Sequence, residues 1–430
     1  MRILLITQYW APENGIPQRR WAWLTQILEE AGHEVLVVAP PPHYLRGIGF
    51  REWVEQKGYR SKLEIRDETR NTVMVRSGYI PGGSSITQKT VNQLAVAFGG
   101  LRAITKRNGY VSRFQPQIVI GTVPALPTAF VAAVAAARFK IPYVIDLRDA
   151  WPELLTEADR WNASTGKPSL RQKVLAKGPL QLAVRVTDFG LKRLLGRASG
   201  VISTSSYLAK DLETRQHRPL RTWTIRNVFP PETLIVKKPT SVRSTSTLNV
   251  LYAGTLGRAQ NLSNALRASQ IANRSGVKVQ LRFVGAGAAK KELMEEASSM
   301  DIPVTFENRR DATLLEECYQ WADTALVHLT DWVPLSNAVP SKTYELMDLR
   351  LHISGVVTGE TASIIESLGA GDVVRPEDPE ALAQLWIELA RNRYRLRVPT
   401  CGSRWVEQQR MEVAPRVLLE CIDWVSGIEK

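Results

Sequence analysis

Short apolar runs alternate with longer amphipathic segments along this chain, and the alternation starts twice. The first half opens with the run RILLIT, a loop, the segment RRWAWLTQILEEAG and a second run, EVLVVAP. Short apolar runs predict strands buried on both faces of a parallel sheet, and the segments between them predict helices with one apolar stripe. Further strands of this half are expected at 72–76, 117–121, 142–147 and 200–203.

The second half repeats the pattern after a polar, proline-containing stretch. Its runs NVLYAG, VKVQLRFVG, IPVTF, DTALVHL and HISGVV again alternate with helical segments. This alternation predicts an α/β protein with two doubly wound, Rossmann-like domains that face a central cleft. The last segment could return to the first domain, and Pro415 should kink or break its helix. The predicted first domain, linker, second domain and C-terminal helical segment are 1–229, 230–247, 248–404 and 405–430.

Composition narrows the class of protein. At 430 residues the chain exceeds one typical core, and 44% hydrophobic with 23% charged residues is a globular composition. The three cysteines are odd in number and far apart, which argues against a disulfide framework and favours a reducing cytoplasm. The net charge of +14 implies an anionic partner, and nucleic acid, acidic lipid or a phosphorylated small molecule would each satisfy it.

Two features bear on membranes. The stretch 118–137 is long enough to span a bilayer, but two prolines divide it and its alanines make it weakly hydrophobic. We therefore expect a buried strand, a turn and a helix there. Lysine and arginine interleave with apolar residues in 70–114 and 167–197, as on helices that lie on an anionic bilayer surface. The alternative for both segments is a core-packing helix with a solvated basic face.

The stretch NAVPSKTYEL at 337–346 suggests a ligand site. Pro340, Ser341 and Lys342 fit a helix start, where unpaired N–H groups and the positive dipole end favour a phosphate. Ser341 could also cap the helix. Glu345, one turn later, could accept hydrogen bonds from two neighbouring hydroxyls, as on a ribose. The alternative is an ordinary capped helix with a solvated lysine and glutamate.

Further candidates follow other predicted strands. Gly15 precedes a helix that begins with Arg19 and Arg20, and Gly287 lies in a turn after a strand. Glycine lets a backbone approach a phosphate and arginine neutralises it, although neither segment is a GxGxxG or P-loop motif. Asp149, in the segment DLRD, follows a strand at the edge where ligands bind in such sheets. Tight turns, solvated basic faces and a structural Arg–Asp salt bridge are the alternatives.

Other kinds of site lack a sequence pattern. The five histidines show no metal-ligand spacing, and His328 and His352 lie in apolar strand patterns typical of core residues, so we expect neither a metal nor a cofactor. No GxSxG motif or plausible Cys–His pair is present. The 12 tryptophans are dispersed and no RRM, HTH or KH pattern accompanies the basic charge, so nucleic acid is not expected as a partner.

Taken in order, a series of motifs covers essentially the whole chain: WAPENGIPQRRWAWLTQILEEAGHEVLVV, DLRDAWPELL, VISTSSYLAKDL, IRNVFPP, LYAGTLGRAQNL, FVGAGAAKKEL, TLLEECYQWADTALVHL and VPSKTYELM. In this series the chain resembles the family 4 retaining glycosyltransferases of GT-B fold, and among them bacterial fucosamine and N-acetylhexosamine transferases of surface-polysaccharide biosynthesis. The resemblance implies a nucleotide-diphosphate sugar, expected to be UDP-linked, held mainly by the second domain. It also implies an acceptor met by the first domain.

The resemblance assigns roles by position. Glu345 corresponds to the glutamate that holds the donor ribose, and the backbone of Ser341, Lys342 and Thr343 to the helix start that meets the diphosphate. Gly15 corresponds to a glycine near the donor phosphate. Gly285 and Gly287 correspond to the turn that borders the nucleotide base. Asp149 corresponds to a position beside the transferred sugar.

The chain departs from the family pattern in its phosphate-binding charges. A second glutamate is usual where Asn337 stands, and an arginine and a lysine are usual where Thr255 and Gln260 stand. Other positive side chains are expected to take the place of this arginine and lysine. The expected substitutes are Arg258, Lys342 and Arg20.

The implied activity is sugar transfer with retention and without a metal. The departing diphosphate would be stabilised by helix N-termini and by Arg258 and Lys342, while Asp149 orients the sugar. The implied acceptor is a lipid-linked saccharide or glycolipid, with the enzyme bound peripherally to the anionic cytoplasmic face of the membrane. The alternatives are a soluble transferase acting on a small molecule, a sugar-nucleotide epimerase of the same fold, and a non-catalytic sugar-nucleotide-binding protein.

Overall fold

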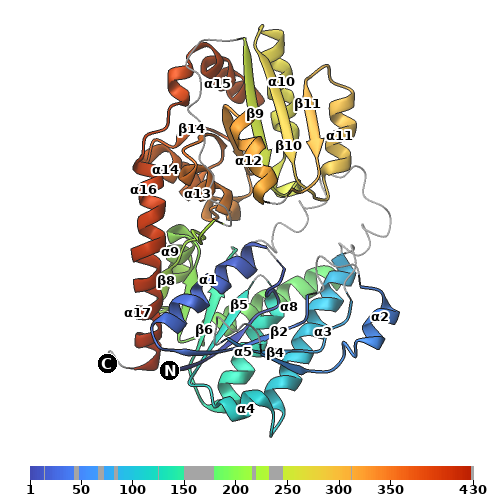
Figure 1. Ribbon diagram of the computed structural model, residues 1–430, viewed down its shortest axis with the longest axis vertical. Helices are drawn as coiled ribbons and strands as arrows, with labels where there is room; N and C mark the ends of the chain where they lie inside the picture. Colours follow the sequence, from blue (N-terminus) through green and yellow to red (C-terminus); the bar gives the residue numbers. More distant parts are fainter. Residues whose placement is uncertain are drawn as a thin grey trace. The chain divides into compact units, whose positions relative to one another are not determined.

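The computed structural model describes residues 1–13, 15–42, 48–65, 72–81, 86–123, 125–149, 179–215, 219–231, 246–310 and 312–427. These residues form two compact units (Figure 1). Unit 1 contains the described residues of 1–149, 179–229 and 412–427, and unit 2 contains those of 230–411.

Unit 1 is built on an eight-stranded sheet. Its strands are β1 (Arg2–Ile6), β2 (Glu34–Ala39), β3 (Lys62–Ile65), β4 (Val73–Arg76), β5 (Ile118–Val123), β6 (Tyr143–Leu147), β7 (Gly200–Ser203) and β8 (Thr222–Thr224). Their order is β3-β4-β2-β1-β5-β6-β7-β8, and every pair is parallel except β3 with β4. Every residue of β5 and β6 is buried, as expected for strands covered by helices on both faces.

Among the described residues, the helices of unit 1 are α1 (Ile16–Glu30), α2 (Phe50–Glu55), α3 (Ile86–Thr105), α4 (Tyr110–Phe114), α5 (Leu126–Phe139), α8 (Pro179–Leu195), α9 (Ser206–Arg215) and α17 (Ala414–Ser426). Helix α5 packs against both α3 and α8. Small residues bring α5 close to the sheet, because a Cβ at Gly121 would lie only 2.7 Å from the Cβ of Ala132.

Unit 2 is built on a six-stranded sheet that is parallel throughout. Its strands are β9 (Thr247–Ala253), β10 (Lys278–Val284), β11 (Val304–Glu307), β12 (Thr324–His328), β13 (His352–Val356) and β14 (Gly371–Val374). The order is β11-β10-β9-β12-β13-β14, the strand order 3-2-1-4-5-6 of a dinucleotide-binding sheet. The direction of winding reverses between β9 and β12, so this pair marks the topological switch point.

The α-helices of unit 2 are α10 (Ser263–Arg274), α11 (Lys290–Ser298), α12 (Ala312–Trp321), α13 (Ser341–Asp348), α14 (Gly359–Ser367), α15 (Pro379–Arg391) and α16 (Cys401–Gln408). Helix α15 packs on α10 and on β9, and it places Trp386 in the core with no exposed surface. Helix α16 packs on α13. The helices thus cover a parallel sheet whose carboxyl edge carries the loops before α13 and after β9 and β10.

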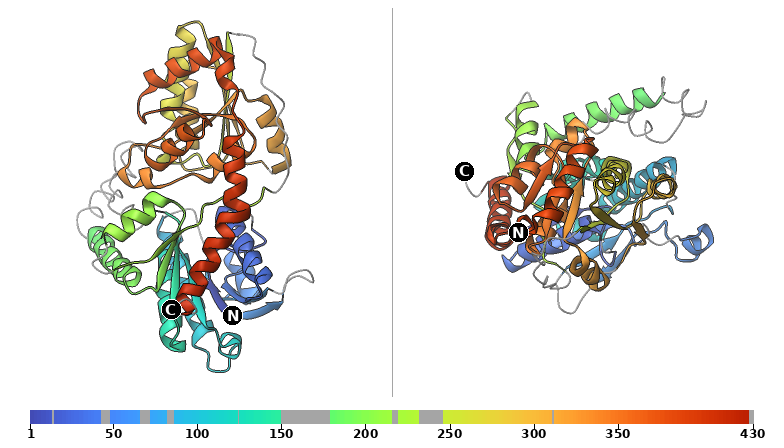
Figure 2. Two further views of the ribbon diagram at one scale, coloured as in Figure 1. Left: turned by 90° about the vertical axis from the view of Figure 1, so that its left-hand side faces the viewer. Right: turned by 90° about the horizontal axis from the view of Figure 1, so that it is seen from above.

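The C-terminal helix contains one wider turn. Residues Gln409–Val413 form a π turn between α16 and α17, and Pro415 is the second residue of α17. Because proline has no N–H to donate to the preceding turn, the expected disturbance at Pro415 takes the form of this π turn. Helix α17 then packs against α1 and β8, so the C-terminal segment returns to unit 1 (Figure 2).

The predicted fold class is confirmed by these two parallel-sheet units. The stretch 118–137 is the strand β5 followed by the helix α5, as expected. Among the described residues, no helix has the length and apolarity that a membrane crossing requires. Parts of the predicted linker and of the two basic segments lie outside the described residues, namely 232–245, 70–71, 82–85 and 167–178.

The cysteines are all free thiols. Cys318 on α12 and Cys421 on α17 are buried, whereas Cys401, the first residue of α16, is exposed. Burial raises the pKa of both the Cys318 and the Cys421 thiols. Only the exposed thiol is therefore open to reagents in solution.

Candidate functional site

The predicted helix start in unit 2 is the first turn of α13, which follows β12 at the carboxyl edge of the sheet. Pro340 occupies the N-cap position and no side chain caps the helix, so Ser341 does not act as the expected cap. The N–H of Thr343 donates to the carbonyl of Pro340 at 2.9 Å. The first-turn amides left for an anion are therefore those of Ser341 and Lys342. Thr343 contributes no exposed surface.

Glu345 is held in position by two neighbouring side chains. Its Oε1 accepts a hydrogen bond from the hydroxyl of Tyr319, which is fully buried on α12. Its Oε2 lies 2.8 Å from the Nζ of Lys342, and this ammonium also donates to the Tyr319 hydroxyl at 3.0 Å. The Glu345 side chain keeps 35% of its surface exposed, so the oriented carboxylate remains accessible. Lys342 therefore forms an ion pair with Glu345. Its expected role was to neutralise the charge of a phosphate.

Arg258 lies at the topological switch point of the unit 2 sheet. It begins a short 3-10 helix, η2 (Arg258–Gln260), in the loop that follows β9. The carbonyl of Ala259 accepts the N–H of Thr330 at 2.9 Å, which ties this turn to the segment after β12. Ligands of open α/β sheets bind in the crevice at such a switch point. The fold therefore places Arg258 where an anionic ligand is expected.

The two histidines of unit 2 strands are core residues, as expected. His328 ends β12, its Nε2 lies 3.1 Å from the Nδ2 of Asn264, and burial lowers its pKa to about 3. His352 lies 2.9 Å from the hydroxyl of Thr324 and 3.0 Å from a carboxylate oxygen of Asp372. His328 is therefore neutral and adds no positive charge to the switch point.

Gly285 and Gly287 let two loops touch. The turn after β10 runs against the loop after β9, where the N–H of Leu256 donates to the carbonyl of Ala286 at 3.0 Å. A Cβ on Gly285 would lie 1.9 Å from the carbonyl oxygen of Gly254, and one on Gly287 would lie 2.1 Å from that of Leu256. No side chain fits at either position. This contact accounts for both glycines, and their role at a nucleotide base stays a prediction.

Gly15 and Asp149 lie at the carboxyl edge of the unit 1 sheet, after β1 and β6. Gly15 is the N-cap of α1, and a Cβ there would lie 2.5 Å from the Oε1 of Gln18. That Oε1 is buried and has no hydrogen-bond partner among the described residues. Asp149 is exposed and follows Arg148 just beyond β6. Both residues thus occupy the edge at which a parallel sheet presents its ligand-binding loops.

The assignment of Arg20 as a phosphate ligand does not fit the structure. Arg20 is fully buried, and its Nη2 forms an ion pair of 2.8 Å with Asp146, which is also fully buried. Its Nη1 donates to the carbonyl of Ile225 at 2.7 Å and to the Oδ1 of Asn227 at 3.2 Å. Trp21 donates its indole N–H to the second oxygen of Asp146 at 2.7 Å. Arg20 is therefore committed to an internal network that ties α1 to β6 and to the segment after β8.

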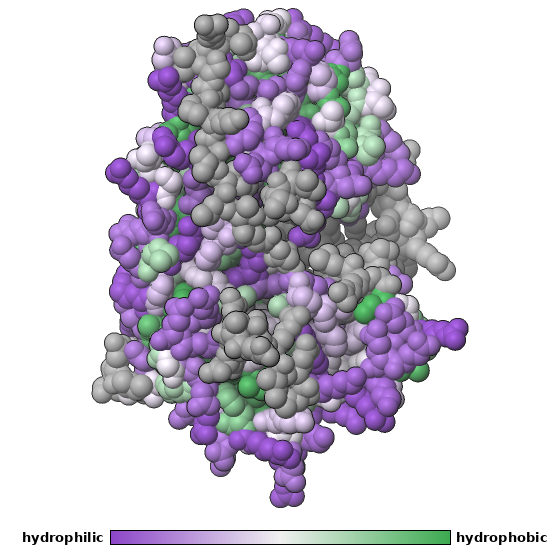
Figure 3. Space-filling view, viewed as in Figure 1, coloured by the Kyte–Doolittle hydropathy of each residue, from purple (hydrophilic) through white to green (hydrophobic). Residues whose placement is uncertain are grey.

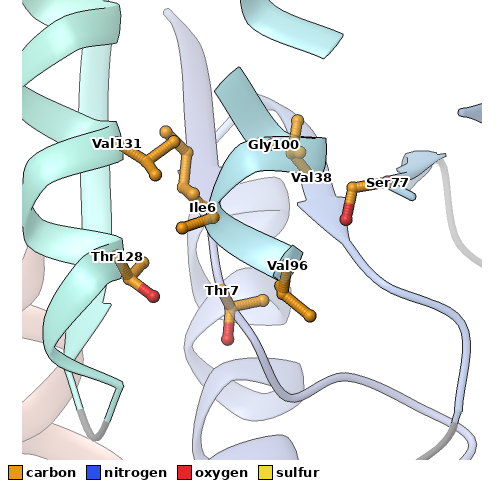
Figure 4. A pocket seen from close by; sticks show the side chains of 9 residues that line it. Ile6, Thr7, Val38, Ser77, Val96, Gly100, Thr128 and Val131 are labelled. Atoms are coloured by element: carbon orange, nitrogen blue, oxygen red, sulfur yellow. The ribbon is translucent and has the colours of Figure 1, made fainter. Parts of the chain in front are cut away.

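A small cavity lies inside unit 1. Its volume is about 10 Å³, and it is lined by the ends of β1 and β2 and by α3 and α5 (Figure 4). Ile6, Val38 and Val131 give it an apolar wall, and Thr7 and Thr128 add hydroxyl groups. Small-molecule sites usually occupy about 300–1,000 Å³. We therefore assign no substrate to this cavity.

The unit 2 edge combines three groups with complementary chemistry. A helix start offers amide donors, an oriented carboxylate offers two acceptors one turn later, and an arginine stands at the switch point. Such a set can hold an anion together with a pair of hydroxyls. Glu345, Lys342 and Arg258 are predictable from the sequence, but Tyr319 is not, because a tyrosine in an amphipathic helix carries no signal of the carboxylate it will orient.

Comparison with known families assigns the two halves of the chain. Residues 17–227 match the family described as "Glycosyl transferase 4-like domain", and residues 247–392 match the family described as "Glycosyl transferases group 1". A search of curated proteins finds no significant match.

Solved structures share the fold over the full length of the chain. Sucrose-phosphate synthase from Thermosynechococcus elongatus superposes with a TM-score of 0.66 at 15% identity, covering 100% of this chain and 99% of the other. HepE from Anabaena in complex with UDP gives 0.61 at 14% identity, covering 99% and 100%. WaaG, a glycosyltransferase involved in lipopolysaccharide biosynthesis, gives 0.58 at 11% identity, covering 99% and 100%. Together with the two family matches, this shared fold shows that the chain belongs to the family 4 glycosyltransferases and has the GT-B fold.

Proposed function

We propose that this glycosyltransferase takes its sugar from a UDP-linked donor bound at the carboxyl edge of the unit 2 sheet. The observation that carries the proposal is the oriented carboxylate of Glu345, held by Tyr319 and Lys342 one turn inside α13. Its two oxygens can accept hydrogen bonds from the two ribose hydroxyls, while the amides of Ser341 and Lys342 meet the diphosphate. Complexes of the similar protein HepE with UDP and with UDP-glucose support this choice of nucleotide.

Transfer is proposed to proceed with retention and without a bound metal. The α13 amides and Arg258 stabilise the diphosphate as it leaves the anomeric carbon. The acceptor oxygen then bonds to the anomeric carbon on the face that the diphosphate leaves, its proton passes to the departing phosphate, and Asp149 orients the sugar. Retention would appear as an unchanged anomeric configuration in the product by NMR, and transfer should continue in excess EDTA.

The test of the function is a panel of ligands followed by a transfer assay. UDP and a UDP-sugar should raise the melting temperature of the protein, because a ligand at 100 times its Kd stabilises the folded state by about 2.7 kcal/mol. GDP and CDP serve as controls for the base. UDP-sugar with a lipid-linked saccharide should then yield a glycosylated lipid. Stabilisation by UDP without such a product, or release of free sugar alone, would contradict the proposed transfer.

Tyr319→Phe should weaken UDP binding about 10-fold, because one hydrogen bond to a charged group contributes about 1.5 kcal/mol. The hydroxyl lost in this variant is the one that donates to Glu345 and accepts from Lys342. Calorimetry with UDP and with 2′-deoxy-UDP provides the measurement. The wild type should prefer UDP, and the variant should lose most of that preference.

The control is Tyr394→Phe, because Tyr394 is a tyrosine of the same unit with 63% of its surface exposed. It should bind both nucleotides as the wild type does. Full preference for UDP in the Tyr319 variant would show that this tyrosine does not position Glu345.

We further propose that unit 1 binds an anionic membrane and that the acceptor is a lipid-linked saccharide or glycolipid on its cytoplasmic face. Helix α3 exposes Val91, Leu94 and Phe98 along one stripe, with Phe98 at 68% exposure. Helix α8 exposes Val186 and Phe189 in the same way. Large apolar side chains at i, i+3 and i+7 on a surface helix are typical of an interfacial helix.

Positive side chains accompany both stripes. Arg102 is exposed at the end of α3, and Arg185, Lys192 and Arg193 are exposed on α8. Figure 3 shows apolar patches among hydrophilic surface in the region of α2 and α3. Each lysine or arginine near an anionic surface contributes about 1 kcal/mol, and the apolar side chains add the energy of their insertion. The two helices therefore carry both contributions that peripheral binding requires.

The double variant Leu94→Ser with Phe98→Ser should bind vesicles containing anionic lipid at least about 10-fold more weakly than the wild type. Cosedimentation with anionic and with neutral vesicles measures the effect. The control is Met294→Ser with Val333→Ser, two exposed apolar residues of unit 2. Equal binding by the wild type and the α3 variant would remove α3 from the membrane-binding surface.

A further inference from the structure

Arg148 is a partly buried cation that the proposed mechanism does not use. It follows β6 directly, and its Nε and Nη1 atoms are buried without a hydrogen-bond partner among the described residues. The side chain as a whole is half-buried. Guanidinium nitrogens without an acceptor are costly to bury, so a native protein that keeps them in this state calls for an explanation.

The backbone fixes Arg148 at the carboxyl edge of the unit 1 sheet. Its N–H donates to the carbonyl of Val123, the last residue of β5, at 3.3 Å. Its carbonyl accepts the hydroxyl of Thr204, just after β7, at 2.8 Å. The residue is thus tied to both neighbouring strands, and its position does not depend on the side chain finding a partner.

Nearby carboxylates leave the charge of Arg148 incompletely matched. Asp146 already serves Arg20 and Trp21 through both of its oxygens. Burial lowers the pKa of Arg148, an effect that Asp149 and Asp146 oppose and that the positive charge of Arg20 reinforces. Two guanidinium groups therefore share the fully buried carboxylate of Asp146, and the second nearby carboxylate, Asp149, is exposed. An anion bound at this edge would meet the positive charge of Arg148 and N–H groups that have no acceptor among the described residues.

We propose that Arg148 is an anion-binding residue of unit 1 that takes a phosphate oxygen of a substrate at the carboxyl edge of β6. The proposal rests on the function proposed above, whose substrates include phosphates. Guanidinium suits this task because it stays charged and presents several N–H donors to phosphate oxygens. A change of side-chain rotamer would turn the two buried nitrogens toward the anion. The phosphate belongs either to the nucleotide sugar or to a diphosphate-linked lipid acceptor.

Hydrogen–deuterium exchange of the full-length wild type tests the site locally. The probes are inorganic diphosphate, UDP and a water-soluble short-chain prenyl-diphosphate saccharide. At least one of them should slow exchange of the amides in 143–149, apart from any effect at 341–345. No protection of 143–149 by any of the three would overturn the proposal, whether or not a variant folds.

The variants Arg148→Gln and Arg148→Lys identify the source of the phosphate. If it is the donor, Arg148→Gln should raise the Kd of UDP at least 10-fold. If it is the acceptor, the Kd of UDP should stay unchanged while KM for the prenyl-diphosphate saccharide rises at least 10-fold. Arg148→Lys should recover part of the loss in either case. Arg113→Gln, the same charge change on α4 near the opposite edge of the sheet, should have no effect.

The outcomes separate this assignment from the proposed function. A protein that protects 143–149 but transfers no sugar would keep the anion site and reject the transfer. A protein that transfers sugar with an Arg148→Gln variant within twofold of wild type for every constant would reject the anion site alone.

Discussion

Glu345→Gln is expected to lower kcat/KM for the nucleotide sugar about 100-fold, because two charge-assisted hydrogen bonds to the ribose become weaker neutral ones. The carboxylate lies on the first turns of α13, where Tyr319 and Lys342 orient it. Steady-state kinetics with the donor varied and the acceptor saturating give the measurement, and calorimetry with UDP gives the binding part.

The same variant should leave the folded protein almost as stable as the wild type. The Lys342–Glu345 pair is partly exposed, and such pairs contribute about 0–1 kcal/mol. Glu366→Gln on α14 is the matched control, since Glu366 is exposed in the same unit. A Glu345→Gln enzyme with wild-type kcat/KM would remove the carboxylate from donor binding.

Asp146→Asn should destabilise unit 1 by about 3–5 kcal/mol, because it leaves the Arg20 guanidinium buried without its counter-charge. Asn keeps an oxygen for the indole N–H of Trp21, so the loss comes mainly from the charge. Urea unfolding followed by tryptophan fluorescence measures it, and the unit 1 transition is analysed separately from that of unit 2.

The control for this prediction is Glu55→Gln, which breaks the Arg51–Glu55 pair on α2. Those side chains are 95% and 65% exposed, so the change should alter the free energy of unfolding by less than about 0.5 kcal/mol. UDP binding in unit 2 should survive in Asp146→Asn at temperatures where unit 1 is folded. A loss as small as that of the control would show that Arg20 is accommodated without Asp146.

The interior strands could be predicted from sequence because burial on both faces leaves a continuous apolar run. RILLIT, EVLVVAP and DTALVHL are β1, β2 and β12. The edge strands β3, β8 and β14 were missed, since β3 is KLEI and β8 is TWT, too short or too polar to form such a run. Helix α15 was also missed, although Asp378 before Pro379 is a strong start signal, and its side chain caps the N–H of Ala381.

The candidate site was predictable where its chemistry lies in neighbouring residues. Lys342 and Glu345 are three apart, so helical spacing alone brings them together. Arg20 was misassigned because its partner, Asp146, is 126 positions away in sequence and joins it only when α1 packs on β6. Gly285 and Gly287 were recognised, but the close contact with the loop after β9 that excludes a side chain there is a property of the folded sheet.

The three thiols differ in their accessibility to labelling reagents. Of the three cysteines, only Cys401 is exposed, while burial raises the pKa of the other two. A maleimide fluorophore should therefore label the wild-type protein at Cys401 alone. That position begins α16, which packs against α13, so emission from the dye should report directly when a nucleotide arrives beside Glu345.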